Sequence, residues 1–350
     1  MIYNFRLEIV EKFIKDGHEV HISSPYGNRI DELVKLGCIY HSIKFERHGI
    51  NPISEVKLIF LYKKLIKIVK PDIIFGFTIK PNIYGAIAAK SYHYPFVANI
   101  TGLGTAVGNG GIKQKLFLLL YKYAFKEIQR VFFQNTENQE LFLKNAIGVG
   151  KNILLPGSGV NLKKFMPLNY PGKETIEFVF ISRIMKEKGI EQYLQAARYI
   201  SSRYPNTKFH ICGFCEKEYK GRLDEYIKEG FIIYHGLVQD IRSIIQFTHC
   251  TVHPTYYPEG ISNVLLESSA CARPIITTDR AGCREVIDDG INGYKIPEKN
   301  TDALIVAIER FIALSWEEKR KMGLQGRIKV EASFDRCMVV EAYERELKQV

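Results

Sequence analysis

Two glutamates eight positions apart are the clearest candidates for chemistry in this sequence. Glu259 lies in a loop, and Glu267 lies one turn inside a predicted helix, on the same face as Asn263. Carboxylates accept hydrogen bonds from sugar hydroxyls, and unpaired amides at a helix start bind phosphate. The stretch therefore predicts a binding site for a sugar nucleotide. The amides expected to be free are those of Gly260, Ile261 and Ser262, the last being also the predicted N-cap.

Two cations stand where a leaving diphosphate would need them. Arg183 and Lys188 follow a predicted strand at 176–181, on a strand-to-helix turn. Glycosyl transfer from a nucleotide sugar leaves negative charge on the diphosphate, and cations stabilise that charge. Arg can contact two phosphate oxygens at once, while Lys adds a mobile point charge. We therefore predict that Glu259, Arg183 and Lys188 are the catalytic residues, the alternative being solvated charges without a role.

The Glu259 and Glu267 spacing resembles the signature of the GT-B glycosyltransferases of family 4. Further stretches match this family in order: Ser182-Arg183 with Lys188-Gly189, Arg273 to Thr278, and Gly282 to Gly293. The resemblance implies that Glu259 contacts the transferred sugar, Glu267 the ribose, and the two cations the diphosphate. It also implies a retaining mechanism. The nucleotide base would be framed by Gly213, Leu237 and Val238.

The order of predicted elements favours two domains. Short β-rich runs alternate with longer helical runs in both halves, which is typical of parallel sheets flanked by helices. Together with the resemblance, this predicts an α/β protein of the GT-B class, with two Rossmann-like, doubly wound domains facing across a cleft. A linker rich in Gly, Pro and Asn marks the boundary. The expected parts are an acceptor-binding domain at 1–160, a nucleotide-sugar-binding domain at 161–334, and a helix at 335–350 that returns to the first domain.

The predicted elements have the following positions. Strands are expected at 19–23, 38–43, 72–76, 95–100, 130–134, 152–155, 176–181, 207–212, 231–235, 249–253, 273–277 and 293–296. Helices are expected at 3–16, 29–36, 53–70, 82–91, 112–128, 136–146, 189–203, 216–229, 238–247, 263–272, 301–314 and 335–349. The chain starts with residues that already look like the first helix, so we expect the first strand of the N-terminal sheet to be missing. Since that strand is central in a doubly wound sheet, its neighbours would lose backbone partners.

Candidates for acceptor binding lie in the first half. Thr101 and Gly102 follow the predicted strand 95–100, and ligands gather at the carboxyl ends of parallel strands. Thr is no general base at neutral pH, so removal of the acceptor proton falls to the departing phosphate. Lys80 is a predicted contact to an acceptor diphosphate, with a solvated lysine as the alternative. Arg6 is a second candidate of the same kind.

Charge is distributed unevenly along the chain, whose formal net charge is +11. Residues 1–160 hold 21 Lys and Arg against 12 Asp and Glu, an excess of nine. The basic stretches 57–70 and 111–130 carry apolar side chains at helical spacing, which fits either core-packed helices or a face resting on an anionic membrane. No nucleic-acid motif accompanies the charge, so nucleic acid is not an expected partner. Seven scattered cysteines predict reduced thiols, and no run of 18 apolar residues is present.

A narrower function follows from the resemblance. The stretches 78–85, 99–104 and 254–260 resemble the family branch that adds an N-acetylhexosamine to an undecaprenyl-diphosphate-linked sugar in surface glycan biosynthesis. This implies a UDP-sugar donor, a lipid-linked saccharide acceptor and a cytoplasmic enzyme at the inner face of the membrane. No Asp-Xaa-Asp motif occurs, so neither a chelated metal nor another cofactor is implied. The alternatives are a truncated, inactive remnant that still binds nucleotide sugar, and a GT-B UDP-sugar 2-epimerase, although the latter would not explain the glutamate pair.

Overall fold

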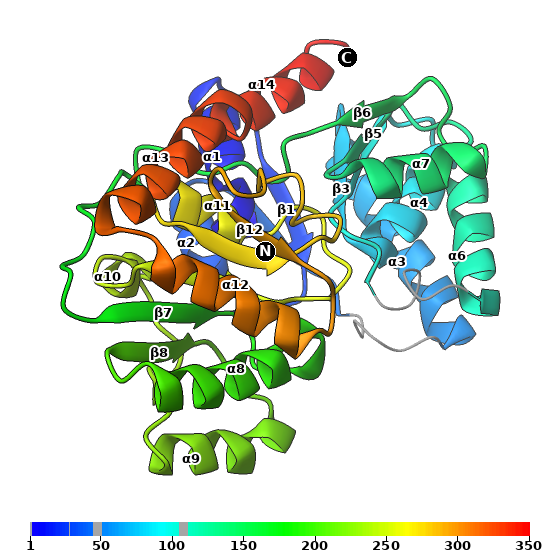
Figure 1. The fold of residues 1–350 in the computed structure, drawn as a ribbon. Coiled ribbons are helices and arrows are strands. Elements are labelled where there is room, and N and C mark those ends of the chain that lie inside the picture. The colour runs from blue at the N-terminus through cyan, green and yellow to red at the C-terminus, as the bar shows by residue number, and fades with distance from the viewer. Residues whose placement is uncertain (1, 28, 45–50, 105–110) are drawn as a thin grey trace. The chain divides into compact units, whose positions relative to one another are not determined.

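The computed structural model describes residues 2–27, 29–44, 51–104 and 111–350. The chain divides into two compact units: unit 1 comprises Met1–Ser158 and Cys337–Val350, and unit 2 comprises Gly159–Arg336. The boundaries expected from the sequence, after residues 160 and 334, differ from these by two residues each. Both units combine parallel strands with helices, which confirms the predicted α/β class (Figure 1).

Unit 2 is built on one six-stranded parallel sheet of order β12-β11-β10-β7-β8-β9. Its strands are β7 (Ile176–Ile181), β8 (Thr207–Cys212), β9 (Ile233–Tyr234), β10 (Cys250–His253), β11 (Ile275–Thr278) and β12 (Gly293–Ile296). From β7 the chain adds strands in one direction, and it then returns to add β10 on the other side. The switch point of this doubly wound sheet therefore lies between β7 and β10, where ligands bind in such folds.

Helices cover both faces of the unit 2 sheet. They are η2 (Lys186–Lys188), α8 (Ile190–Arg203), η3 (Lys217–Tyr219), α9 (Lys220–Lys228), α10 (Arg242–Ile245), α11 (Asn263–Ala270), α12 (Thr301–Ala313) and α13 (Trp316–Ser333). Buried side chains of α8, α9 and α12 form one core cluster with the sheet, and those of α10, α11 and α13 contribute to others. The strand expected at 231–235 and the helix expected at 238–247 are shorter than predicted.

The sequence analysis predicts no helix between residues 314 and 335. This prediction is wrong, because α13 occupies this stretch. Its start is fixed by a capping box in which Ser315 and Glu318 bond each other's backbone amides. Two internal glycines, which weaken helix prediction, have a packing role here. A Cβ at Gly323 would lie 2.1 Å from the carbonyl oxygen of Ala272, and Gly326 approaches Ser269. The glycines thus let α13 lie directly against α11.

Unit 1 contains two separate parallel sheets, one of order β1-β2 and one of order β3-β4-β5-β6. The strands are β1 (His21–Ser24), β2 (Ile39–Ser42), β3 (Ile74–Phe77), β4 (Phe96–Ile100), β5 (Arg130–Phe133) and β6 (Asn152–Leu154). Among the described residues, β1 pairs only with β2, and β3 pairs only with β4. Within the described residues no strand joins these two sheets, which divide between β1 and β3.

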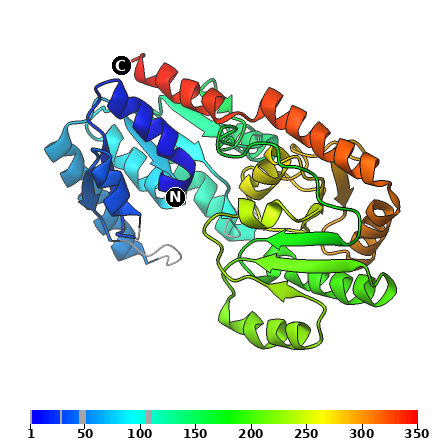
Figure 2. The same cartoon turned by 90° about the vertical axis from the view of Figure 1, so that its left-hand side faces the viewer.

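Helices cover both faces of the four-stranded sheet, while α2 (Ile30–Lys35) packs on the two-stranded sheet. The other helices among the described residues of unit 1 are α1 (Ile2–Lys15), α3 (Pro52–Val69), η1 (Pro81–Gly85), α4 (Ala86–Lys90), α6 (Gly111–Ala124), α7 (Thr136–Lys144) and α14 (Arg336–Leu347). Because strand side chains alternate, Phe96 and Ala98 of β4 face the cluster formed with α3, α4, α6 and α7, whereas Val97 faces α1 and α14. Figure 2 shows α14, in red, beside α1, where Lys12 pairs with Glu344 at 2.7 Å.

Candidate active site

Two loops meet at the switch point of unit 2. The loop after β7 packs onto the loop after β10 so closely that a Cβ at Gly189 would lie 2.0 Å from the carbonyl oxygen of Pro254. Gly189 also has φ +79°, which favours glycine. The amide of Tyr256 donates to the carbonyl of Glu187 at 2.8 Å. Since β7 and β10 are neighbours, their carboxyl-end loops come together although some 70 residues separate them.

This contact brings Lys188 and Glu259 together. The ammonium of Lys188 forms an ion pair with the carboxylate of Glu259 and lies 4.9 Å from the ring centre of Tyr257. Burial opposes ionisation of Glu259, but the charge of Lys188 and a contact with His253 outweigh it and lower the pKa of Glu259 to about 2. Glu259 is therefore an acceptor of hydrogen bonds at neutral pH, as the contact to sugar hydroxyls requires.

His253 is a member of this cluster that the sequence analysis missed. It ends β10, is 1% exposed, and its Nε2 lies 3.3 Å from Oγ of Ser262 and 3.8 Å from Oε1 of Glu259. Burial lowers its pKa, which favours the neutral ring. Within the described part of the chain its Nδ1 has no hydrogen-bond partner. The sequence feature that could have identified His253 is its position at the end of a strand, two residues before Thr255. The hydroxyl of Thr277 holds its carbonyl at 2.7 Å.

The start of α11 differs in two ways from the expectation. Ser262 occupies the N-cap position but makes no side-chain cap bond, because its hydroxyl contacts His253 instead. Its amide is not free, since it donates to the carbonyl of Gly282 at 2.9 Å. The first intrahelical bond runs from Leu266 to Ser262, so the amides without intrahelical partners begin at Asn263. The predicted phosphate site therefore shifts toward the first turn of the helix.

Two further groups at α11 are suited to a polar ligand. The side-chain oxygen of Asn263 is buried and has no hydrogen-bond partner among the described residues. Burial raises the pKa of Glu267 to about 7, against the opposing effect of the nearby charges of Arg336 and Lys164. Buried polar atoms normally have partners, so the Asn263 oxygen is suited to a group supplied by a ligand.

Gly213 stands at the carboxyl end of β8 as predicted. Its amide donates to the carbonyl of Gly236 at 2.8 Å, and a Cβ there would lie 1.8 Å from the carbonyl oxygen of Ser182. Only glycine fits this crossing of strand ends. Leu237, in the following turn, is 78% exposed, whereas Val238 packs beside the small core cluster that includes Val179.

Arg183 has a different ion-pair partner from Lys188. Its guanidinium pairs with Glu216, of the loop after β8, at 3.6 Å, and its side chain is about half exposed. An exposed pair of this kind is worth little free energy, so the guanidinium can exchange Glu216 for another anion.

The acceptor candidates of unit 1 are less uniform. Thr101 and Gly102 follow β4, as expected. Lys80 is not solvated, because its ammonium pairs with Glu55 of α3 at 2.6 Å in a largely buried position. Arg6 is 3% exposed, with its guanidinium 5.3 Å from the ring centre of Phe77. Both cations proposed as acceptor contacts are thus largely buried within unit 1.

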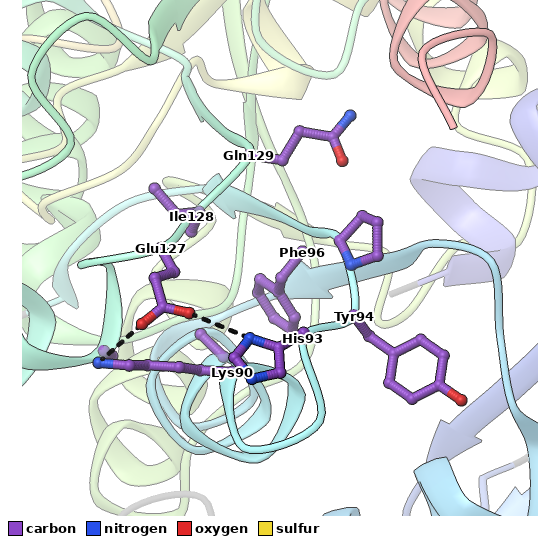
Figure 3. A pocket seen from close by; sticks show the side chains of 10 residues that line it. Lys90, His93, Tyr94, Phe96, Glu127, Ile128 and Gln129 are labelled. Atoms are coloured by element: carbon purple, nitrogen blue, oxygen red, sulfur yellow. Dashed lines mark ion pairs between the residues drawn. The ribbon is translucent and has the colours of Figure 1, made fainter.

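No predicted site residue lines the pocket drawn in Figure 3. It is lined by the end of α4, the start of β4 and the end of α6, and Glu127 there pairs with Lys90 at 3.5 Å and His93 at 3.7 Å. It opens near the amino end of β4, opposite to the end at which ligands gather. In the parts of the chain that the structure describes, no group of three His, Cys, Asp or Glu side chains could hold a metal ion. The same parts contain no helix that is both long and apolar enough to cross a membrane.

Two known protein-family models match the chain, one within each unit. Residues 166–329 match the family model of glycosyl transferases group 1, and residues 2–135 match that of glycosyl transferase 4-like proteins. The chain is a glycosyltransferase. This glycosyltransferase is 26% identical to the N,N'-diacetylbacillosaminyl-diphospho-undecaprenol alpha-1,3-N-acetylgalactosaminyltransferase of Campylobacter jejuni, over 98% of this chain and 94% of the relative. It is also 26% identical to the capsular polysaccharide biosynthesis glycosyltransferase CapM of Staphylococcus aureus, over 96% and 91%.

Solved structures show the same fold. A glycosyltransferase from Rickettsia africae superposes with a TM-score of 0.81 at 19% identity, covering 98% of this chain and 93% of that one. HepE from Anabaena, solved in complex with UDP, superposes with a TM-score of 0.79 at 15% identity, covering 94% and 92%. These likenesses confirm the predicted GT-B fold.

Proposed function

We propose that this glycosyltransferase moves an N-acetylhexosamine from a UDP-sugar to a saccharide linked to a polyprenyl diphosphate, with retention of configuration. The observation that carries the donor half is the cluster of Lys188, Glu259 and His253 at the switch point of unit 2. The acceptor half is supported by the Campylobacter jejuni relative, whose name states an undecaprenyl-diphosphate-linked acceptor. HepE, the structural relative solved with UDP, supports the choice of nucleotide.

Each donor-site residue has a role in the proposal. The ionised Glu259 accepts hydrogen bonds from the transferred sugar, and Lys188 and Arg183 stabilise the diphosphate as it leaves. The first amides of α11 contact a phosphate, while Glu267 accepts hydrogen bonds from the ribose hydroxyls. Gly213, Leu237 and Val238 line the base through backbone groups.

The bond changes need no further protein base. The bond from the anomeric carbon to the diphosphate oxygen breaks, and the acceptor hydroxyl forms a new bond on the same face. Its proton passes to the leaving phosphate oxygen, since Thr101, beside the proposed acceptor position, is a poor base at neutral pH. The diphosphate charge is met by side chains and amides, so chelation of divalent metal should leave the transfer rate unchanged.

The proposed place of action is the inner face of the cytoplasmic membrane, because a polyprenyl-linked acceptor is membrane-borne. The excess of nine positive charges in residues 1–160 supports this location.

Transfer from radiolabelled UDP-GalNAc and UDP-GlcNAc to a polyprenyl-diphosphate-linked saccharide tests the proposal directly. We expect product with at least one of these donors and none with the matching GDP- or ADP-sugars. Binding of UDP without any turnover would favour the inactive remnant, and turnover with only a GDP-sugar would contradict the donor assignment. NMR of the product should show that the anomeric configuration of the donor is kept.

A further inference from the structure

Helix α6 of unit 1 exposes a continuous apolar stripe. Four side chains spaced i, i+4, i+7 and i+11 are 51–87% exposed: Ile112, Leu116, Leu119 and Tyr123. At about 100° per residue they fall within a stripe roughly 60° wide on one side of the helix. The opposite side of α6 is buried in the core of unit 1 through Leu118, Tyr121 and Ala124. One side of α6 therefore packs in the core, and a second apolar stripe faces solvent. Apolar residues scattered singly over a surface would not form such a stripe.

Lysines border this stripe on both sides. By the same helical geometry, Lys113 lies on one edge, and Lys115 and Lys122 lie on the other. Lys126, in the turn after the helix, places its ammonium 5.8 Å from the ring centre of Tyr123. Gly111–Ala124 contains no Asp or Glu. No described residue forms an ion pair with Lys113, Lys115 or Lys122, so their charges are available to an outside partner.

Helix α3 adds a second patch of the same composition. Ile53, Val56 and Phe60 are 52–80% exposed, and exposed lysines follow them toward the end of the helix. The only acidic residue of α3, Glu55, is turned inward to Lys80. Helices α3 and α6 both pack against α4 on one face of the four-stranded sheet (Figure 1). Their exposed sides thus combine apolar and basic side chains without an acidic one.

We propose that α6, with the exposed side chains of α3, docks unit 1 onto an anionic lipid bilayer. The apolar stripe inserts among the acyl chains near the headgroups, and the lysines extend to the anionic headgroups beside it. Charge complementarity selects an anionic bilayer over a neutral one. The biological purpose of the docking rests on the proposed function, because a lipid-linked acceptor would be met at this surface, but the surface itself can be tested without any transfer reaction.

The test is co-sedimentation of the full chain with vesicles of phosphatidylcholine alone or with added phosphatidylglycerol. We expect wild-type protein to bind only the vesicles that contain phosphatidylglycerol, and less so at high salt. The double variant Leu116→Glu, Leu119→Glu should bind about tenfold more weakly or worse, since it places two anions in the apolar stripe. Lys113→Gln with Lys115→Gln should weaken binding several-fold.

Matched controls lie in unit 2. Val306→Glu with Ile328→Glu alters two apolar side chains that are 54% and 55% exposed, and Lys220→Gln with Lys228→Gln removes two exposed lysines. Both controls should bind vesicles like the wild type. A thermal melt of each variant shows whether unit 1 is folded, and the lysine variant keeps the test valid if the Leu116 and Leu119 variant does not fold.

Three results would overturn the proposal. They are equal binding of wild type and stripe variants, equal binding to neutral and anionic vesicles, and a wild-type dimer that the stripe substitutions separate into monomers, which would make the stripe a contact between copies.

Transfer to a short-chain, water-soluble prenyl-diphosphate acceptor separates this proposal from the proposed function. Stripe variants should retain that transfer. Absence of transfer in all proteins with intact vesicle binding would refute the function and leave the docking surface standing.

Discussion

The two units share the α/β architecture but differ in the continuity of their sheets and in the placement of their predicted site residues. Unit 2 has a continuous six-stranded sheet whose switch point brings Lys188, Glu259 and His253 together. Unit 1 has a divided sheet, and its two predicted cations, Lys80 and Arg6, are buried in contacts with its own side chains. A nucleotide presents the same charged groups to every member of such a family, whereas acceptors differ. Under the proposed function, donor binding in unit 2 depends on a few fixed side chains, and acceptor binding in unit 1 depends on surface and shape.

The largest expected effect concerns the buried pair in unit 1. Lys80→Ala leaves the carboxylate of Glu55 buried without this partner, which should lower the free energy of unfolding by about 3 kcal/mol. The double variant Lys80→Met, Glu55→Leu should recover most of the loss, as measured by urea unfolding. If Lys80 instead contacts the acceptor, the double variant will be stable but will have a strongly raised KM for acceptor.

In unit 2 the corresponding change should affect rate more than stability. Lys188→Ala should raise the transfer barrier by about 2 kcal/mol or more, because the ammonium meets charge that develops as the diphosphate leaves. Lys186→Ala removes an exposed lysine two residues away and is the control. Rapid-quench measurement of kcat should separate the two variants. Equal rates for both would exclude Lys188 from the mechanism.

A pH effect of moderate size is expected at Glu267. Its pKa in the free protein is raised to about 7 by burial, so its ionised form is disfavoured by folding and stability should fall as pH rises from about 4.3, the value of a free carboxyl, toward 7. Ribose hydroxyls favour the ionised form, so affinity for UDP should increase as pH rises through 7. Glu267→Gln should flatten this dependence and weaken binding at pH 8 by about 1 kcal/mol. Calorimetry of UDP binding at several pH values checks this prediction, and a wild-type affinity that did not change with pH would contradict the ribose contact.

An effect no larger than that at Glu267 is expected at His253, which positions its neighbours. His253→Phe keeps the ring volume but removes the contacts of Nε2 with Ser262 and Glu259, and this should cost about 1 kcal/mol in the transfer barrier. The KM for the UDP-sugar should change little. Because the imidazole is buried and neutral, the pH profile of kcat should keep its shape. A shifted profile would instead assign His253 a proton-transfer role.

Much of the fold could be predicted from local patterns. Strands β7, β8 and β12 begin and end where predicted, because buried parallel strands are short apolar runs with clear ends. Helix α13 escaped prediction, since its two glycines read as helix breakers until the closeness of α11 is known. At the site, the positions of Glu259, Glu267 and Lys188 followed from type and spacing. The role of His253 did not, as a histidine at a strand end is usually a packed core residue.

The sequence alone determined which side chains are candidates for binding a nucleotide sugar, because residue type and helical spacing decide what chemistry a short stretch offers. Strand order decided which of them meet. Lys188 and Glu259 are 71 positions apart, and they form an ion pair because β7 and β10 are neighbours and Gly189 allows their loops to touch. The bond from the Ser262 amide to Gly282 and the inward pairing of Lys80 likewise depend on packing between distant segments. Such contacts have no local signal, since their energy comes from surfaces that exist only after the chain has folded.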